Sequence, residues 1–280
     1  MSSTVGPDPY AWASDRAEEE RRLVAQSRLF EPVTEQLLVQ AGVGPGMHVI
    51  DLGSGAGDTA ILAARLVGPG GSVLGIERSP EQAALARRRV ADLGLDNVTF
   101  REGDVAALGD LLEQHPGPVD AVMGRLILMW VPERAAVLAA CAQALAPGTL
   151  VWFLEADLTY DYAMPPSPLW AQLGAWFVPT LERLGAECRM GPKLYRAFGD
   201  AGLPATLESR TIMAGGPTAP VWFFVNVARA LLPMMSQFGV ATPAEVDLDT
   251  LEARLLTDLT ANGAAIIIPP LTAAWGRVPG

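Results

Sequence analysis

The part of this sequence best suited to chemistry is a glycine-rich stretch at residues 49–58, which reads Val-Ile-Asp-Leu-Gly-Ser-Gly-Ala-Gly-Asp. The glycines at 53, 55 and 57 let the backbone turn tightly and approach a ligand closely, because no Cβ occupies that space. A β-branched run precedes the stretch and a helical pattern follows it. We therefore expect a ligand-binding loop between a strand and a helix.

Two carboxylates follow at the ends of the next two expected strands. The run 71–77 ends at Glu77, and the run 97–104 ends at Asp104. In an open parallel sheet, ligands bind outside the carboxyl ends of the strands, where the strand order reverses. Glu77 suits the two hydroxyls of a ribose and Asp104 suits an adenine amino group, so the three strand ends together suit a nucleoside.

The spacing of the glycines separates two nucleoside cofactors. A dinucleotide fold uses G-x-G-x-x-G, and here that register puts Asp58 in the place of the third glycine. A pyrophosphate would also face the carboxylates of Asp51 and Asp58 with no compensating cation nearby in the sequence. A cationic sulfonium with an α-amino group meets no such repulsion. The pattern therefore favours S-adenosylmethionine over a nicotinamide dinucleotide.

The elements that must position these residues alternate along the chain. The expected strands are 47–53, 71–77, 97–104, 119–125 and 149–157. The expected helices between them are 59–67, 79–94 with Ser79 as its cap, a weak one through 111–112, and 132–148. A helix at 191–204, a strand at 205–213 and a last strand within 264–278 complete the pattern. This alternation predicts an α/β fold, a seven-stranded mostly parallel Rossmann-like sheet with helices on both faces and helical cap insertions.

The remaining segments complete a domain plan. We expect one helix at 14–30 and a second, short one at 32–41. The plan has an N-terminal lid helix (1–30), a cofactor-binding core (31–157), a cap insertion (158–190) and a completion of the sheet (191–280) with a helical cap insertion at 215–262.

Several stretches in order resemble the successive motifs of class I S-adenosylmethionine-dependent methyltransferases, in a bacterial branch that acts on small molecules. They are VIDLGSGAGD, LGIERSP, FREGDVAAL, DAVMGRLILMWVPERAAVLAACAQALAPG and FLEAD. The resemblance implies that Gly53, Ser54 and Gly55 approach the methionine part of the cofactor and that Arg125 lies at its methionine end. It also implies Glu77 for the ribose, Asp104 for the adenine amino group and Val105 for the adenine ring.

The complete candidate cofactor set is Gln26, Asp51, Gly53, Ser54, Gly55, Asp58, Glu77, Arg78, Asp104, Val105 and Arg125. Four parts of this set have a simpler alternative. The glycine loop is then an ordinary tight turn, Glu77 caps the following helix, Asp104 is a turn residue, and Arg125 pairs with Glu155 on the neighbouring strand. The sequence departs from the family pattern at Trp130, where many relatives carry a histidine, so a histidine role there is absent.

Methyl transfer from a sulfonium needs mainly a nucleophile held behind the methyl carbon. A base is needed only when the acceptor must lose a proton early. His48 begins a strand and His115 lies in a loop, so we expect neither to be catalytic. The candidate bases are the carboxylates and phenols Glu155, Asp157, Tyr160, Tyr162 and Tyr10.

Composition limits the partners. The chain has 20 basic and 31 acidic residues, a net charge of −11, and no basic patch, which argues against nucleic acid as a substrate. The two cysteines are far apart, so neither a disulfide framework nor a metal cluster is expected, and a reducing cytoplasm fits. The polar N-terminus is no signal peptide, and residues 221–240 are too polar for an isolated membrane span.

Charged residues make up only 18% of the chain, which leaves an apolar surface, an apolar pocket or a homodimer interface to account for. The cap segments are rich in aromatics and methionines; such side chains usually pack together, and they also suit an apolar acceptor. The leading hypothesis is methyl transfer from S-adenosylmethionine to an N, O or C atom of a small, fairly apolar metabolite. The alternatives are an S-adenosylmethionine-binding protein of non-methylating chemistry, a nicotinamide-dependent oxidoreductase and a methyltransferase acting on a protein.

Overall fold

The computed structural model describes residues 16–113, 115 and 117–280, which fall into two compact units. The sheet unit consists of Ser27–Glu155, Met190–Ser209 and Thr272–Gly280. The helical unit consists of Ala156–Arg189, Arg210–Leu271 and, of the described residues before Ser27, residues 16–26.

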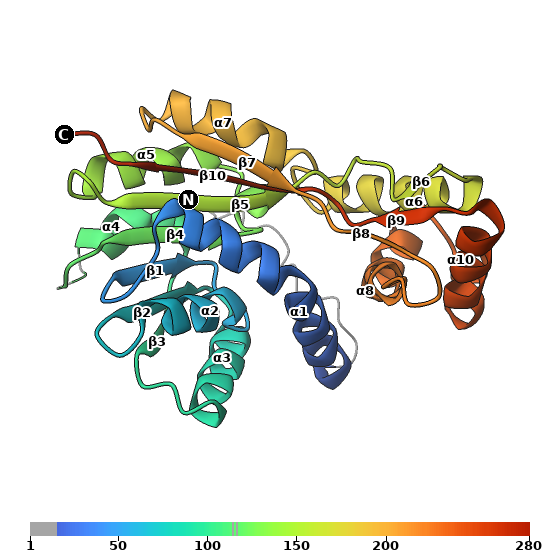
Figure 1. Ribbon diagram of the computed structural model, residues 1–280, viewed down its shortest axis with the longest axis horizontal. Coiled ribbons are helices and arrows are strands. Elements are labelled where there is room, and N and C mark those ends of the chain that lie inside the picture. The colour runs from blue at the N-terminus through green and yellow to red at the C-terminus, as the bar shows by residue number, and fades with distance from the viewer. Residues whose placement is uncertain (1–15, 114, 116) are drawn as a thin grey trace. The chain divides into compact units, whose positions relative to one another are not determined.

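The sheet unit is built on a seven-stranded sheet, within the described residues, in the order β3-β2-β1-β4-β5-β10-β7 (Figure 1). Its strands are β1 (His48–Leu52), β2 (Ser72–Glu77), β3 (Val98–Glu102), β4 (Ala121–Arg125), β5 (Leu150–Ala156), β7 (Thr206–Arg210) and β10 (Leu271–Arg277). All neighbouring pairs from β3 to β5 are parallel. The order reverses next to β1, so the glycine-rich loop after β1 lies at the point where the topological rule places a ligand.

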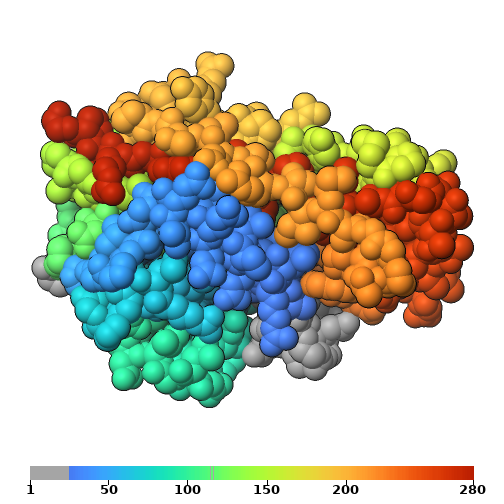
Figure 2. Space-filling view, viewed as in Figure 1, coloured from blue at the N-terminus to red at the C-terminus, as the bar shows by residue number. Residues whose placement is uncertain are grey.

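Strand β10 lies between β5 and β7 and runs antiparallel to β5. Val278, just after β10, is hydrogen-bonded through its backbone to Gly148 and Thr149, which precede β5. The end of the chain thus lies among the segments of this unit, as the dark red atoms of Figure 2 show. The prediction of a seven-stranded, mostly parallel sheet is confirmed.

Helices in two groups cover this sheet. Helix α2 (Asp58–Val67) packs on β1, β2 and β3, and α3 (Pro80–Asp92) packs on β2 and β3. Helices α4 (Leu108–Glu113), α5 (Arg134–Ala144) and α7 (Met190–Asp200) form a second contiguous group, with the short helices η1 (Val105–Ala107) and η2 (Leu128–Trp130) next to the ends of β3 and β4. Ser79 caps α3 as expected, since its hydroxyl accepts the Gln82 N–H at 3.3 Å.

The N-terminal region differs from the prediction of two helices, which was wrong. One helix, α1 (Arg16–Ala41), runs through Pro32 without a break in its assignment. A proline inside a helix costs about 3 kcal/mol. Phe30, Leu37 and Leu38 flank it and are almost fully buried, and this burial offsets the cost.

The helical unit has a small core of its own. Helices α6 (Pro168–Arg183), α8 (Trp222–Gln237) and α10 (Leu248–Asn262) contact one another, and α9 (Pro243–Val246) contacts α8. Strands β6 (Ala163–Met164), β9 (Ala265–Ile267) and β8 (Met213–Gly215) form an antiparallel sheet in that order. The sequence did not predict this sheet, because strands of two or three residues are too short to show an alternating pattern.

Aromatic rings fill this core. The Phe224 ring lies 5.0 Å from the Tyr162 ring and 5.1 Å from the Trp170 ring, centroid to centroid. Phe177 and Phe223 are also buried. For these rings the packing interpretation holds, because each one contacts other rings or the core of its own unit.

Candidate functional site

The glycine-rich loop after β1 is held in a conformation that requires glycine. Gly53, Gly55 and Gly57 have φ angles of +64°, +53° and +85°. A Cβ on Gly53 would lie 2.6 Å from Ile127 Cγ1 and still closer to Cδ1, and one on Gly57 would lie 3.0 Å from the Phe100 ring. The backbone of this loop is therefore closely covered by neighbouring side chains as well as tightly turned.

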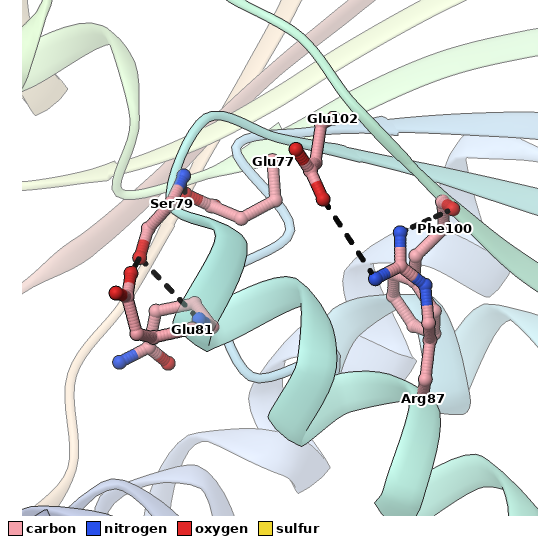
Figure 3. A network of polar contacts seen from close by, with 7 residues as sticks. Glu77, Ser79, Glu81, Arg87, Phe100 and Glu102 are labelled. Atoms are coloured by element: carbon pink, nitrogen blue, oxygen red, sulfur yellow. Dashed lines mark hydrogen bonds and ion pairs between the residues drawn. The ribbon is translucent and has the colours of Figure 1, made fainter.

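Glu77, at the end of β2, fastens this loop. Its Oε2 accepts the Gly55 N–H and its Oε1 accepts the Ser79 N–H, both at 2.8 Å. The side chain is buried, and burial raises the pKa of this carboxyl while the two N–H groups oppose that shift. Figure 3 shows Glu77 beside Ser79 at the start of α3. Each carboxylate oxygen keeps a second lone pair, so the group can also accept hydroxyls of a ribose.

Asp51 and Ser54 contribute buried polar atoms that lack partners among the described residues. Asp51 Oδ2 and Ser54 Oγ are both fully inaccessible and without a hydrogen bond in the part of the chain that the structure describes. Burial raises the pKa of Asp51 to about 8, against the opposing charge of Arg125. Buried polar groups are almost always paired, so these two atoms beside the glycine loop fit a polar ligand such as a charged amino acid moiety.

Arg125, at the end of β4, is half-buried and donates to the Thr34 hydroxyl of α1 at 3.4 Å. No ion pair with Glu155 is formed among the described residues, so the alternative pairing considered for Arg125 is not observed. The positive charge of Arg125 acts on Asp51 instead. This places a cation and a buried carboxylate together near the end of β1, as a zwitterionic ligand would require.

Asp58 has a cationic partner that the sequence did not reveal. Arg89 of α3 lies 2.6 Å from the Asp58 carboxylate and also donates to the Ala56 carbonyl. The expectation that no cation compensates this carboxylate was therefore wrong, because the fold brings α3 against the start of α2. Asp58 nevertheless occupies the third position of the dinucleotide pattern, where that pattern has a glycine.

The expected adenine-binding residues lie at the end of β3. Asp104 is exposed, and its Oδ1 accepts the Ala106 N–H at 2.9 Å to cap η1, so the turn role of Asp104 is observed. Val105 is buried, and Arg78, after β2, is exposed. Glu102, in β3, lies 4.0 Å from Arg87 at the surface (Figure 3).

Glu155, a candidate base, is completely buried at the end of β5. Its Oε1 accepts the N–H groups of Ile127 at 3.0 Å and Leu128 at 2.7 Å, and its Oε2 accepts that of Met129 at 3.3 Å. Burial raises its pKa to about 8, although these three N–H groups act against the shift. The Glu155 carboxylate thus accepts only backbone N–H groups of residues 127–129 in these bonds, and it holds the turn that these residues form after β4.

The other candidate bases lie in the helical unit or outside the described residues. Asp157 accepts both the N–H and the hydroxyl of Thr159. Tyr162 is buried and donates to the Leu158 carbonyl at 2.8 Å, and burial raises the pKa of its phenol. Tyr160 is 50% exposed. Gln26 lies in α1, and Tyr10 lies outside the described residues.

His48 begins β1, at the end of the strand opposite the glycine loop, and its Nδ1 is 2.8 Å from the Ser72 hydroxyl. Within residues 16–113, 115 and 117–280, no cluster of three or more His, Cys, Asp or Glu side chains could hold a metal ion. Among the helices described, none has the length and apolarity that a membrane span requires.

Comparison with known proteins identifies the family to which this part of the chain is similar. Residues 44–181 match a family model described as "Methyltransferase domain". This chain contains a class I, S-adenosylmethionine-dependent methyltransferase domain. The match spans the glycine loop and every strand-end residue assigned above to the cofactor.

Two curated relatives share this part of the chain. An arsenite methyltransferase of Halobacterium salinarum is 38% identical over 133 residues, which are 46% of this chain and 33% of the relative. A trans-aconitate 2-methyltransferase of Methylobacterium nodulans is 37% identical over 113 residues, 40% of this chain and 39% of the relative. The methyltransferase domain thus spans between about a third and two fifths of these relatives' length.

Two solved structures share the fold over most of the chain. A geranyl diphosphate methyltransferase in complex with S-adenosylmethionine has a TM-score of 0.54 at 19% identity, covering 97% of this chain and 93% of that one. The [4+2]-cyclase SpnF has a TM-score of 0.52 at 16% identity, and the alignment covers 89% of this chain and 82% of that one. At these identities the likeness shows the fold alone.

Proposed function

We propose that this protein transfers the methyl group of S-adenosylmethionine to an N, O or C atom of a small, fairly apolar molecule. The observation that carries the proposal is a pair of buried polar atoms, Asp51 Oδ2 and Ser54 Oγ, which have no partner within residues 16–113, 115 and 117–280. They lie beside a left-handed glycine loop that Glu77 holds by a hydrogen bond. When bound, S-adenosylmethionine supplies an electrophilic methyl on a sulfonium.

In this proposal, different residues of the sheet unit bind different parts of the cofactor. Gly53 and Gly55 offer backbone close to the methionine part, with Ser54 and Asp51 satisfying its polar groups and Arg125 at the same end. Glu77 accepts from the ribose hydroxyls, Asp104 accepts from the adenine amino group, and Val105 packs on the adenine ring. Arg78, after Glu77, is exposed and contributes positive charge at the rim.

The acidic end of β1 suits a cation. The negative charges of Glu77 and Asp58 both raise the pKa of Asp51, although Asp58 is itself paired with Arg89. A sulfonium and an α-ammonium group lower the energy of such a cluster, because they favour its ionised form. A pyrophosphate would raise it. This charge balance supports S-adenosylmethionine over a dinucleotide.

The acceptor is proposed from chemistry and from the relatives together. The relatives' names refer to arsenite, trans-aconitate and geranyl diphosphate, which are all small molecules of different chemistry. Their diversity supports a small-molecule acceptor and leaves its identity open. The net charge of −11 argues against a nucleic acid acceptor.

A second function stays a candidate because a [4+2]-cyclase has the same fold. In that case S-adenosylmethionine would bind without donating its methyl group. Incubation with methyl-labelled S-adenosylmethionine and a panel of phenols, amines and carboxylic acids separates the two. Methylated product together with S-adenosylhomocysteine supports transfer, and tight binding without either product over the whole panel supports the cyclase-like alternative.

The cofactor assignment itself is tested at Glu77. Glu77→Ala removes an acceptor of ribose hydroxyls and should weaken cofactor binding by about 1.5–3 kcal/mol, the scale for hydrogen bonds to a charged group. Calorimetry with S-adenosylhomocysteine measures this. Glu102→Gln, at an exposed carboxylate in the neighbouring strand, is the matched control and should leave the affinity unchanged. Equal affinities for Glu77→Ala and the control would refute the ribose assignment.

A further inference from the structure

The turn after β4 contains an unusual backbone conformation. Leu126 has a φ angle of +53°, a left-handed conformation that residues with a branched or bulky side chain rarely adopt. After it, the N–H groups of Ile127, Leu128 and Met129 all point to one place. Successive N–H groups around a left-handed residue form a concave site for an anion.

Glu155 fills that site from the end of β5. Its carboxylate accepts the three N–H groups at 3.0, 2.7 and 3.3 Å and is completely buried. Hydrogen bonds to a carboxylate are stronger than those between neutral groups, and here they stabilise a turn that a leucine would otherwise disfavour. Burial raises the pKa of Glu155 to about 8, so the three N–H groups donate to a charged carboxylate above that pH and to a neutral carboxylic acid below it.

The side chain of Ile127 connects this turn to the glycine loop. Its atoms occupy the space beside two glycines: a Cβ on Gly53 would lie 2.6 Å from Ile127 Cγ1, and a Cβ on Gly124 would lie 2.7 Å from Ile127 Cγ2. Ile127 is therefore packed directly against the backbone of Gly53, the first glycine of the loop. The position of its own backbone is fixed by Glu155.

We propose that Glu155 is a positioning residue for the cofactor loop and acts through Ile127. The buried carboxylate fixes the 126–129 turn, the turn presses the Ile127 side chain against Gly53, and the glycine loop is thereby held in its left-handed conformation. The effect on cofactor affinity rests on the proposed function, whereas the effect on the loop itself does not.

Two substitutions separate the steps of this relay. Glu155→Gln keeps the size of the side chain but replaces one oxygen with an NH₂ group, so a donor faces one of the three N–H groups. Ile127→Ala keeps the bonds to Glu155 and removes the contact with Gly53. Glu102→Gln changes an exposed carboxylate of the same unit and is the control.

Hydrogen–deuterium exchange of the full chain without cofactor tests the relay. In Glu155→Gln, amides 127–129 and amides 54–57 should both exchange at least about tenfold faster, the change expected for losing one hydrogen bond to a charged group. In Ile127→Ala, only amides 54–57 should exchange faster. A uniform increase over the sheet unit, or faster exchange at 127–129 alone in Glu155→Gln, would overturn the proposal.

Binding of S-adenosylhomocysteine gives a second readout. Both variants should bind it at least about tenfold more weakly than the wild-type chain does, with KM for S-adenosylmethionine rising more than kcat falls. Weak binding by the wild-type chain would contradict the proposed function and leave the exchange result to decide the relay. Should Glu155→Gln not fold, Ile127→Ala and Ile127→Val decide it, because the relay predicts a graded loosening of residues 54–57.

Discussion

Replacing Gly53 with alanine tests how tightly the glycine loop is enclosed. Gly53 has a φ angle of +64°, and an alanine Cβ there would lie 2.6 Å from Ile127 Cγ1 and 3.2 Å from Ile127 Cβ. Gly94 offers a matched control, because it has the same φ of +64° and nothing within 4 Å of its Cβ position. The two substitutions share the backbone strain and differ in the steric overlap.

The expected magnitudes follow from these two terms. A left-handed non-glycine residue costs about 1–2 kcal/mol, and this applies to both variants. Overlap with a packed side chain adds about 1–3 kcal/mol for Gly53→Ala only. The free energy of unfolding should therefore fall by about 1–2 kcal/mol for Gly94→Ala and by about 2–5 kcal/mol for Gly53→Ala.

Urea denaturation followed by circular dichroism measures both values, and a double variant identifies the cause. In Gly53→Ala/Ile127→Ala the overlapping Cγ1 and Cδ1 atoms are gone, so the double variant should be more stable than the sum of the single effects by about 1–3 kcal/mol. If Gly53→Ala and Gly94→Ala lose the same stability, or if the two changes are additive, the loop is not enclosed by Ile127 and the reasoning is refuted.

Three further predictions concern single side chains. Arg89→Lys should lower the free energy of unfolding by about 1–3 kcal/mol in urea denaturation, because lysine cannot bind Asp58 and Ala56 at once as the guanidinium does. Arg196→Lys, at an exposed pair with Asp200, should change it by under about 0.5 kcal/mol. Equal losses in the two variants would contradict this prediction. The pKa values of Asp51 and Glu155 are raised to about 8 in the folded chain. Between about pH 5 and pH 8 the folded chain therefore holds protons that the unfolded chain has released. The free energy of unfolding should fall as pH rises through this range, by up to about 1.4 kcal/mol per pH unit for each group. In Glu155→Gln the free energy of unfolding should fall less steeply with pH than in the wild type, and in Glu102→Gln it should fall as steeply. Parallel curves for all three proteins would show that Glu155 does not titrate in this range. His48→Gln and His115→Gln should both retain turnover with a suitable acceptor, and loss of turnover in a folded variant that still binds cofactor would make that histidine catalytic.

Features that depend on neighbouring residues could be predicted from the sequence. The cap of α3 by Ser79 with Pro80 behind it, and the turn formed by Gly53, Gly55 and Gly57, follow from local conformational preferences. The seven-stranded, mostly parallel sheet also followed, because strands that alternate with helices form parallel crossover connections. The positions of Glu77 and Asp104 at strand ends were predictable for the same reason.

Contacts between distant segments could not be predicted in this way. The bonds from Glu77 to Gly55, from Arg89 to Asp58 and from Glu155 to Ile127 join residues that only the fold brings together. One signal was present for the last of them: β5 is buried along its whole length, and Glu155 is its one charged residue. A carboxylate in such a strand needs several buried donors, and the nearest backbone turn supplies them.

Whether the glycine loop and the polar groups beside it bind S-adenosylmethionine is tested most directly by a binding measurement. The purified full chain is titrated in a calorimeter with S-adenosylmethionine and, separately, with NAD. We expect saturable binding of S-adenosylmethionine in the low-micromolar to sub-millimolar range and no measurable heat with NAD. Saturable binding of NAD without binding of S-adenosylmethionine would contradict this expectation.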